Sequence, residues 1–290
     1  MGWAGRSLLA LAVLVLAFLG YELWGTGIAE SRSQAALRSQ LAQRIHQPPA
    51  ATPAPNTPNG SGIAAPTASA GTVASPAPEG GPEGVIKIPK VGVDQVFIEG
   101  TATGDLRRGP GHYSGTPLPG QPGNAALAGH RTTYGEPFYN LNELRPGDQI
   151  MVSTASGTYR YDVSRSFVVA PSDVAVIAPT RTNQLTLTTC TPRFSASRRL
   201  IIQASLLGSP APASPVAERS DVGASHVTSA RAWLPVATWG LAAVAVALVA
   251  WLVARRRRRA WPVYLLFAPA FLAVLLMAFA ATSDLLPQMA

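Results

Sequence analysis

Residues 186–200 read TLTTCTPRFSASRRL and contain Cys190, the only cysteine in the 290-residue chain. The β-branched run before Cys190 predicts a strand that ends at the cysteine. A second apolar run, LIIQASLL at residues 200–207, begins directly after two arginines and predicts another strand. A single cysteine excludes an intramolecular disulfide. It leaves two interpretations, a small buried apolar residue or a reactive thiol.

Further short runs of strand-forming residues precede this pair and are separated by Gly- and Pro-containing turns. They lie at residues 85–88, 93–100, 124–130, 148–154 and 158–170. Helical periodicity across this region is weak. Regularly spaced short strands of this kind predict an all-β barrel or sandwich of about 125 residues. We therefore expect one mainly β domain over residues 85–207.

Three long apolar segments lie outside this domain. Residues 7–24 carry no charge except that of Glu22 and predict a transmembrane helix, with a secretory signal peptide as the alternative. Residues 232–254 and 260–282 contain no charged residue, and each is long enough to span a bilayer. We expect these two to form a C-terminal transmembrane helical hairpin. A helical hairpin buried in a large soluble core is the alternative.

The charges flanking these segments predict their orientation. Residues 255–259 are five consecutive arginines between the last two apolar segments, and positively charged loops remain in the cytoplasm. We therefore expect residues 1–6 and 255–259 to be cytoplasmic, and residues 25–231 and 283–290 to be external. The predicted location is the cell membrane, as a multi-pass protein with its β domain outside the cell.

The remaining segments have the composition of connectors. Residues 28–46 lack Gly and Pro, and we expect a juxtamembrane helical stalk over residues 25–46. Residues 47–84 and 208–231 are rich in small residues and proline. Such segments bury too little apolar surface to offset their ordering entropy, so both are predicted to be linkers.

Composition argues against several classes of ligand. The net charge is +8, but the five consecutive arginines account for most of the excess, and no basic patch interleaved with aromatic residues predicts nucleic-acid binding. The four histidines are scattered, and neither a metal-ligand cluster nor an acidic calcium site is evident. No phosphate-binding glycine loop occurs. We expect no metal, no cofactor and no nucleic-acid partner.

A catalytic cysteine needs a partner for its proton and a donor for the charge that develops on an attacked carbonyl. His130 ends the small apolar run NAALAGH, and Arg199 opens the strand that follows Cys190. Three strand ends at one rim of a barrel would bring these three side chains together. Their positions in the sequence alone leave that arrangement open.

The motifs TLTTC, RRLII and AGHR resemble those of sortases, the cysteine transpeptidases of the Gram-positive cell envelope. The resemblance covers residues 84–207 and implies a closed sortase β-barrel. It implies that Cys190 is the nucleophile, that His130 is the general acid/base, and that Arg199 binds the substrate and stabilises the oxyanion. Arg198 is the alternative for the last role. Adjacent residues of a strand point to opposite faces, so only one of the two arginines should face the site.

The stretch GHYSGTPLPGQPGNAALAGHRTTYGEPF at residues 111–138 is similar to class E sortases of high-GC actinobacteria. Tyr113 matches a tyrosine that in this class accompanies a preference for Leu-Ala-x-Thr-Gly over Leu-Pro-x-Thr-Gly signals, and an ordinary packed aromatic is the alternative. Thr188 and Thr189 are expected to line the substrate groove. The small residues Ala128 and Gly129 are expected to let a peptide approach His130.

The resemblance implies that the protein cleaves a sorting signal between Thr and Gly. It would then join the secreted protein that carries this signal to an amine of a peptidoglycan precursor. A pilin-polymerising sortase, a hydrolytic cysteine peptidase and an inactive sortase-like binding module are the alternatives. Two C-terminal spans are unusual for class E. The segment before the barrel also lacks the Asp-Pro-aromatic lid motif of pilin-specific sortases.

Overall fold

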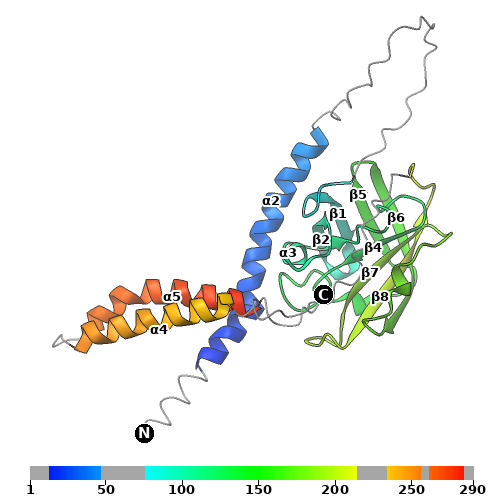
Figure 1. The fold of residues 1–290 in the computed structure, drawn as a ribbon. Coiled ribbons are helices and arrows are strands. Elements are labelled where there is room, and N and C mark those ends of the chain that lie inside the picture. Colours follow the sequence, from blue (N-terminus) through cyan, green and yellow to red (C-terminus); the bar gives the residue numbers. More distant parts are fainter. Residues whose placement is uncertain (1–12, 47–75, 214–233, 256–260, 284–290) are drawn as a thin grey trace, which may run out of the picture. The chain divides into compact units, whose positions relative to one another are not determined.

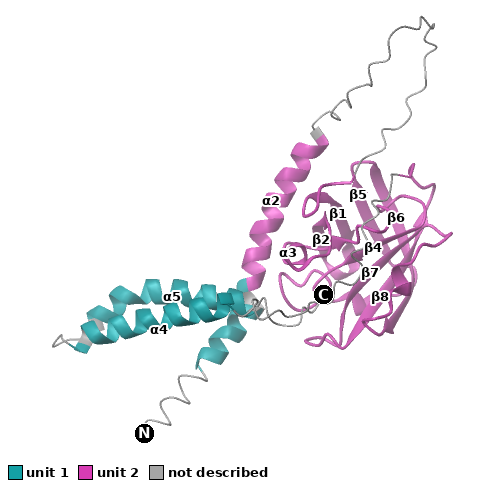
Figure 2. Ribbon diagram, in the orientation of Figure 1, with its two compact units in different colours: residues 1–25, 223–288 teal, residues 26–222, 289–290 magenta. Residues whose placement is uncertain are grey.

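The computed structural model describes residues 13–46, 76–213, 234–255 and 261–283, and these form two compact units (Figure 2). One unit comprises Met1–Gly25 and Gly223–Gln288, and the other comprises Thr26–Val222 with Met289–Ala290. Most of both predicted linkers, the outer ends of the chain and the predicted arginine loop lie outside the described residues.

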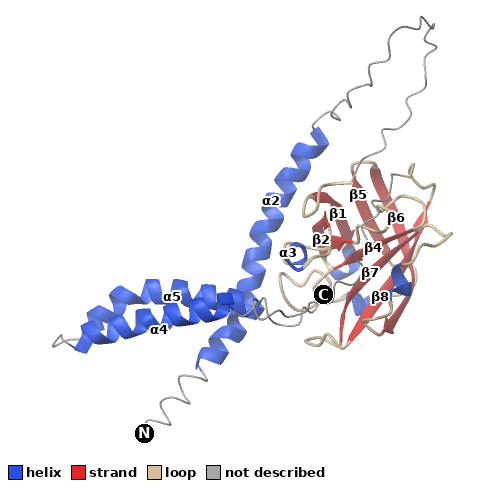
Figure 3. Ribbon diagram, in the orientation of Figure 1, coloured by secondary structure: helices blue, strands red, loops and turns tan. Residues whose placement is uncertain are grey.

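The second unit contains a closed eight-stranded barrel, which confirms the predicted mainly β fold (Figures 1 and 3). The strands pair around the barrel in the order β1-β2-β3-β4-β7-β8-β6-β5. Their bounds are β1 Pro82–Ile88, β2 Val93–Glu99, β3 Gly111–His112, β4 Asn124–Ala128, β5 Gln149–Thr154, β6 Gly157–Val169, β7 Gln184–Thr191 and β8 Arg198–Leu207. Strand β1 begins three residues before the expected domain start, and the two-residue strand β3 was not predicted.

Short helices fill the connections of the barrel. They are the 3₁₀-helices η2 Pro89–Val91, η3 Leu141–Glu143 and η4 Val174–Ile177, and the one-turn helix α3 Thr103–Leu106. Helix η4 lies in the connection between β6 and β7. The side chain of Asn124, at the start of β4, donates to the carbonyl oxygens of Val176 and Ala178, both at 3.1 Å. This connection is therefore fastened to the barrel near the beginning of β4.

Alternation along the strands assigns their faces. In β7, Leu185 and Leu187 belong to the barrel core, whereas Thr186, Thr188 and Cys190 are not members of that core cluster. In β8, Leu200, Ile202 and Ala204 point into the core. Because side chains alternate in a strand, Thr188, Cys190 and Arg199 lie on the outer face of the barrel wall.

Helix α2 (Thr26–His46) packs against the barrel rather than standing free as a stalk. Its Leu37 and Leu41 form a second buried cluster with Val96 and Ile98 of β2. The Gln34 amide donates to the carbonyl of Val96 at 2.9 Å and accepts from its N–H at 2.8 Å. The side chain thereby satisfies a backbone position of β2, in the way that a neighbouring strand would.

The first unit is helical. Residues 13–20 are followed by the π-helix η1 Tyr21–Gly25, and helices α4 Leu234–Arg255 and α5 Trp261–Ser283 pack against each other. Among the described residues, two segments are long and apolar enough to cross a bilayer, Leu234–Val253 and Pro262–Thr282. The Phe279 ring of α5 lies 5.2 Å from the Phe18 ring and 5.9 Å from the Tyr21 ring, centroid to centroid. The N-terminal helical segment and the hairpin therefore share aromatic contacts within this unit.

Candidate active site

Strand pairing brings the segments that carry His130 and Cys190 together. Strands β4 and β7 are parallel, with Ala128 opposite Thr188. Beyond the end of β4, the chain stays beside β7. The Gly129 N–H donates to the Thr188 carbonyl at 3.1 Å, and the Thr189 hydroxyl donates to the Gly129 carbonyl at 2.7 Å. His130 therefore follows β4 next to the strand end that carries Cys190.

Arg199 reaches the same point from the other side of β7. Strands β7 and β8 are antiparallel, with Cys190 opposite Arg199. Arg199 Nη1 donates to Cys190 Sγ at 3.2 Å and to the Ala196 carbonyl at 3.2 Å. Arg198 is exposed and lies opposite Thr191. Of the two arginines that the sequence left open, Arg199 is the one in contact with the cysteine sulfur.

The thiol lies in a buried position that charge partly offsets. Only 1% of Cys190 is exposed to solvent. Burial raises the pKa of the Cys190 thiol, and the positive charges of Arg199 and Arg131 act in the opposite direction. Burial therefore disfavours the thiolate form of Cys190, and the two guanidinium groups favour it.

Arg131 is a site residue that sequence reasoning missed. Its side chain is buried, and Nη1 donates to the carbonyl oxygen of Cys190 at 3.1 Å. Nη2 donates to Asn142 Oδ1 at 2.8 Å, and Nε donates to the Tyr139 carbonyl at 3.3 Å. Burial and the nearby charge of Arg193 lower the pKa of Arg131, but a guanidinium remains charged in a protein. Its position directly after His130 was the one available sequence signal.

Comparison with known proteins identifies the barrel unit. Residues 86–207 match the family model described as a sortase domain. Residues 86–207 form a sortase domain. This part of the chain coincides with the barrel from β1 to β8 and contains all three residues of the predicted catalytic set.

Two curated relatives carry the sortase name. The chain is 32% identical to sortase SrtE1 of Streptomyces coelicolor over 218 residues, which cover 68% of this chain and 54% of that protein. It is 35% identical to sortase D of Bacillus subtilis over 124 residues, which cover 41% of this chain and 61% of that protein. The chain thus spans little more than half the length of either relative.

Solved sortase structures are also similar to part of this chain. Sortase E1 from Streptomyces coelicolor with a tripeptide in the active site is 34% identical, with 47% of this chain and 93% of that chain covered and a TM-score of 0.42. A Clostridium perfringens sortase D5 transpeptidase is also 34% identical, with 45% and 82% covered and a TM-score of 0.43.

The residues expected to bind substrate in the sortase domain fall into two groups. The hydroxyl groups of Tyr113 and Thr188 share a hydrogen bond of 3.1 Å. Burial raises the pKa of the Tyr113 phenol. Thr188 shares the outer face of β7 with Cys190. Thr189 instead is fully buried and holds the Gly129 carbonyl, and Ala128 is 3% exposed between its strand partners. The structure thus places Tyr113 and Thr188 with the cysteine, and Ala128 and Thr189 within the barrel wall.

Gly129 has a packing role in the sortase domain. A Cβ atom at this position would lie 2.6 Å from the Phe138 ring. Phe138 is fully buried and belongs to the barrel core. The absence of a side chain at Gly129 therefore accommodates the Phe138 ring beneath the segment that carries His130.

A second buried histidine of the sortase domain belongs to a polar network of its own. His112 Nδ1 lies 2.7 Å from Glu99 Oε2, and its Nε2 lies 3.0 Å from the Pro117 carbonyl and 3.1 Å from the Thr116 hydroxyl. Both His112 and Glu99 are less than 5% exposed. The pair joins β2 to β3, so we assign His112 a structural role.

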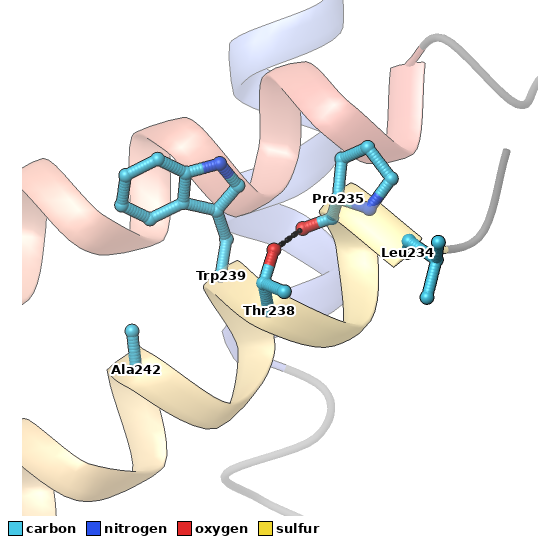
Figure 4. Close-up of a pocket in the computed structure, with 5 residues that line it drawn as sticks. All are labelled: Leu234, Pro235, Thr238, Trp239 and Ala242. Atoms are coloured by element: carbon cyan, nitrogen blue, oxygen red, sulfur yellow. Dashed lines mark hydrogen bonds between the residues drawn. The ribbon is translucent and has the colours of Figure 1, made fainter. Parts of the chain in front are cut away.

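A cavity of about 560 Å³ lies on α4, outside the sortase domain (Figure 4). The polar side-chain groups of its lining are the Trp239 indole N–H and the Thr238 hydroxyl, which donates to the Pro235 carbonyl at 2.9 Å. The cavity has no nucleophile or titratable side chain in its lining, which consists of Leu234, Pro235, Thr238, Trp239 and Ala242. Within the described ranges, no three or more His, Cys, Asp or Glu residues group together as metal ligands would.

Proposed function

We propose that the chain is a membrane-anchored sortase that cleaves a sorting signal and joins the cleaved protein to an amine of a cell-wall precursor. The observation that carries the proposal is the 3.2 Å hydrogen bond from Arg199 to the Cys190 sulfur, next to the segment in which His130 follows β4. The sortase domain at residues 86–207 supports the same chemistry.

The first half of the reaction forms a thioester. His130 accepts the thiol proton, and the Cys190 sulfur attacks the carbonyl carbon of the Thr–Gly bond. Arg199 donates to the oxygen on which negative charge develops. When the C–N bond breaks, the imidazolium of His130 gives its proton to the leaving glycine amine. The signal's threonine is then attached to Cys190 through its acyl carbon.

The second half of the reaction restores the enzyme. An acceptor amine attacks the thioester carbonyl, and His130 takes up the proton that the amine loses. Arg199 again stabilises the oxyanion, and the C–S bond breaks to release Cys190. Attack by water in place of the amine would give hydrolysis. The same three side chains therefore serve both half-reactions.

The proposed signal is of the Leu-Ala/Pro-x-Thr-Gly type, and the proposed subclass is class E. The match to a relative named SrtE1 supports the subclass. The hydrogen bond between Tyr113 and Thr188, on the face that carries Cys190, supports a role for Tyr113 in reading the signal. We expect its phenol to favour alanine over proline at the second position of the signal.

The membrane assignment has three spans with the sortase domain outside the cell. Two apolar helices, Leu234–Val253 and Pro262–Thr282, support the hairpin. The contacts of Phe279 with Phe18 and Tyr21 support a first span that packs near the end of α5. Anchoring would hold the enzyme where membrane-bound substrates meet it, which raises their effective concentration.

The test is a ligation assay with the full chain in detergent. The substrates are Leu-Ala-x-Thr-Gly and Leu-Pro-x-Thr-Gly peptides with either a glycine-based amine or a lysine amine. The products are followed by mass spectrometry, and peptide binding is measured separately. We expect a ligated product that is absent with Cys190→Ala. Cleavage without ligation would replace the proposal by a hydrolytic peptidase, and ligation only to a lysine amine would replace it by a pilin-type enzyme. Binding of signal without cleavage would indicate a binding module.

A further inference from the structure

A turn of unusual backbone conformation follows His130. Tyr134, Gly135 and Glu136 have φ angles of 50°, 71° and 42°. Three consecutive residues in the left-handed region are unfavourable for residues that carry a side chain. Such a conformation persists only where the surroundings determine it.

The first turns of α2 supply the contacts that hold the 134–136 turn. The Thr26 hydroxyl accepts a hydrogen bond from the Tyr134 N–H at 3.2 Å, and Thr26 is only 2% exposed. One helical turn further along α2, the Glu30 carboxylate lies against Gly135. A Cβ atom on Gly135 would be 2.3 Å from Glu30 Oε2, so only glycine permits this approach. Helix α2 thus contacts two of the three residues of the turn.

Other contacts hold α2 against the barrel. Gln34 bonds both backbone groups of Val96, and Arg38 donates to the Asp94 carbonyl at 2.7 Å. Glu30 is 3% exposed, and burial raises the pKa of its carboxyl to about 7, whereas a hydrogen bond with Gln95 and the charge of Arg38 lower it. Contacts of Gln34 and Arg38 therefore hold α2 on β2. Both residues lie C-terminal in α2 to Thr26 and Glu30, which contact the 134–136 turn.

Tyr134 of this turn also contacts His130. The Tyr134 ring lies 5.0 Å from the His130 ring, centroid to centroid, at an interplanar angle of 40°. The guanidinium of Arg107 lies 5.4 Å from the Tyr134 ring centroid. The Phe138 N–H donates to the His130 carbonyl at 3.1 Å and closes the loop at its other end. Contacts therefore run without a break from α2, through the turn and Tyr134, to the His130 ring.

We propose that α2 belongs to the active-site apparatus, because Thr26 and Glu30 hold the 134–136 turn and thereby position Tyr134 against the His130 ring. This inference rests on the proposed function, in which His130 moves the protons. Tyr134 is a positioning residue in contact with the histidine, and Thr26 and Glu30 act through it. Because α2 begins directly after the segment assigned to the first membrane span, the anchor and the general acid/base are linked through a single helix.

The test compares variants of the full chain in detergent. Thr26→Val removes the hydrogen-bond acceptor at constant shape, and Thr26→Ser retains it. Ser31→Ala is the matched control, because the Ser31 hydroxyl is exposed on the same turns of α2 and bonds only the carbonyl of Gly27 among the contacts described. Tyr134→Ala removes the ring contact. The measurements are kcat and KM for ligation across pH 5 to 9, and hydrogen exchange of peptides covering residues 130–138.

With Thr26→Val we expect kcat to fall by about tenfold to a hundredfold, the loss that misplacement of a catalytic group produces. KM should stay within about twofold, and the pH limb assigned to His130 should move. Thr26→Ser should restore wild-type values, and Ser31→Ala should match the wild type. Adding Thr26→Val to Tyr134→Ala should cause no further loss, because both act on one contact chain. Exchange should rise in residues 130–138 and stay unchanged in the barrel strands.

Three results would overturn the inference. The first is a Thr26→Val enzyme with unchanged kcat and unchanged hydrogen exchange. The second is a double variant in which the two losses of kcat multiply. The third is a rise in KM with unchanged kcat, which would make Tyr134 a substrate contact. The outcome is separable from that of the proposed function. If the wild type forms no ligated product, the proposed function fails, whereas the exchange measurement still decides whether α2 holds the loop.

Discussion

Replacing Arg199 should make the Cys190 thiol harder to ionise. The guanidinium Nη1 donates to the sulfur at 3.2 Å, so its charge centre lies about 4 Å from a thiolate at an interaction energy of about 4 kcal/mol for an effective dielectric constant of 20. Arg199 is partly exposed, and solvent reduces this value. A hydrogen bond to a charged group contributes about 1.5–3 kcal/mol, which corresponds to a pKa change of about one to two units. We therefore expect Arg199→Met to raise the thiol pKa by that amount, above a value that burial already raises.

The assay is the pH dependence of alkylation of Cys190 by iodoacetamide, followed by mass spectrometry of the intact chain. Because Cys190 is the only cysteine, each molecule takes one label. At pH 7 the alkylation rate of Arg199→Met should be about tenfold to a hundredfold below that of the wild type, since only the thiolate reacts.

Arg198→Met is the matched control for this experiment. It removes the same charge one residue away, but Arg198 is exposed and lies opposite Thr191 rather than Cys190. We expect it to move the thiol pKa by less than about 0.3 units, because exposed charges are screened. A shift with Arg198→Met equal to that with Arg199→Met would refute the reasoning, and so would an unchanged pKa with Arg199→Met.

Three further predictions concern buried groups. Burial raises the pKa of Glu30 from 4.5 to about 7, so the stability that Glu30 contributes is full below pH 4.5 and is lost as the pH rises through 7. Relative to Glu30→Gln at the same pH, the local opening free energy of wild-type α2, measured by hydrogen exchange, should fall between pH 4.5 and 7 by up to about 3 kcal/mol and stay constant above pH 7. Arg131→Met should lower the melting temperature, measured by thermal unfolding. It should raise the Cys190 thiol pKa, measured by alkylation, by less than Arg199→Met does, because Arg131 bonds the cysteine carbonyl rather than the sulfur. Glu99→Leu should cost about 1–3 kcal/mol of stability by removing the carboxylate that bonds buried His112, and Glu99→Gln, which keeps an acceptor, should cost less in the same thermal unfolding experiment.

The strands and the three candidate catalytic residues could be predicted because each leaves a local signal in the sequence. Alternating apolar residues mark the strands, and the ends of two runs mark His130 and Cys190. The same alternation also bears on Thr188 and Thr189. Adjacent strand residues face opposite sides, so only Thr188 could share the outer face with Cys190, and the structure buries Thr189 inside the wall. The argument from alternating faces, used above for Arg198 and Arg199, applies equally to these two threonines. It predicts that only one of them faces the groove.

Other features leave little or no local signal. Strand β3 has two residues, too few for periodicity, and exists because it pairs with both β2 and β4. Arg131 has only its position after His130 as a signal, and its contact with the cysteine carbonyl depends on the fold. The turn at residues 134–136 takes its conformation from a helix more than a hundred positions earlier in the chain. Such contacts join residues that are distant in sequence, and no pattern within either segment requires them.

The docking of α2 had one signal, and it lies in β2 rather than in the helix. Residues Val96, Phe97 and Ile98 are apolar in succession and all are fully buried, so β2 is covered on both faces. A barrel strand that faced solvent would alternate with polar residues, and a continuous apolar run instead indicates a strand covered on both sides. Phe97 faces the barrel core, whereas Val96 and Ile98 pack against Leu37 and Leu41 of α2. The helix that was predicted to be a juxtamembrane stalk thus provides the cover that the apolar run of β2 indicates. The same docking places Thr26 and Glu30 against the loop that follows His130.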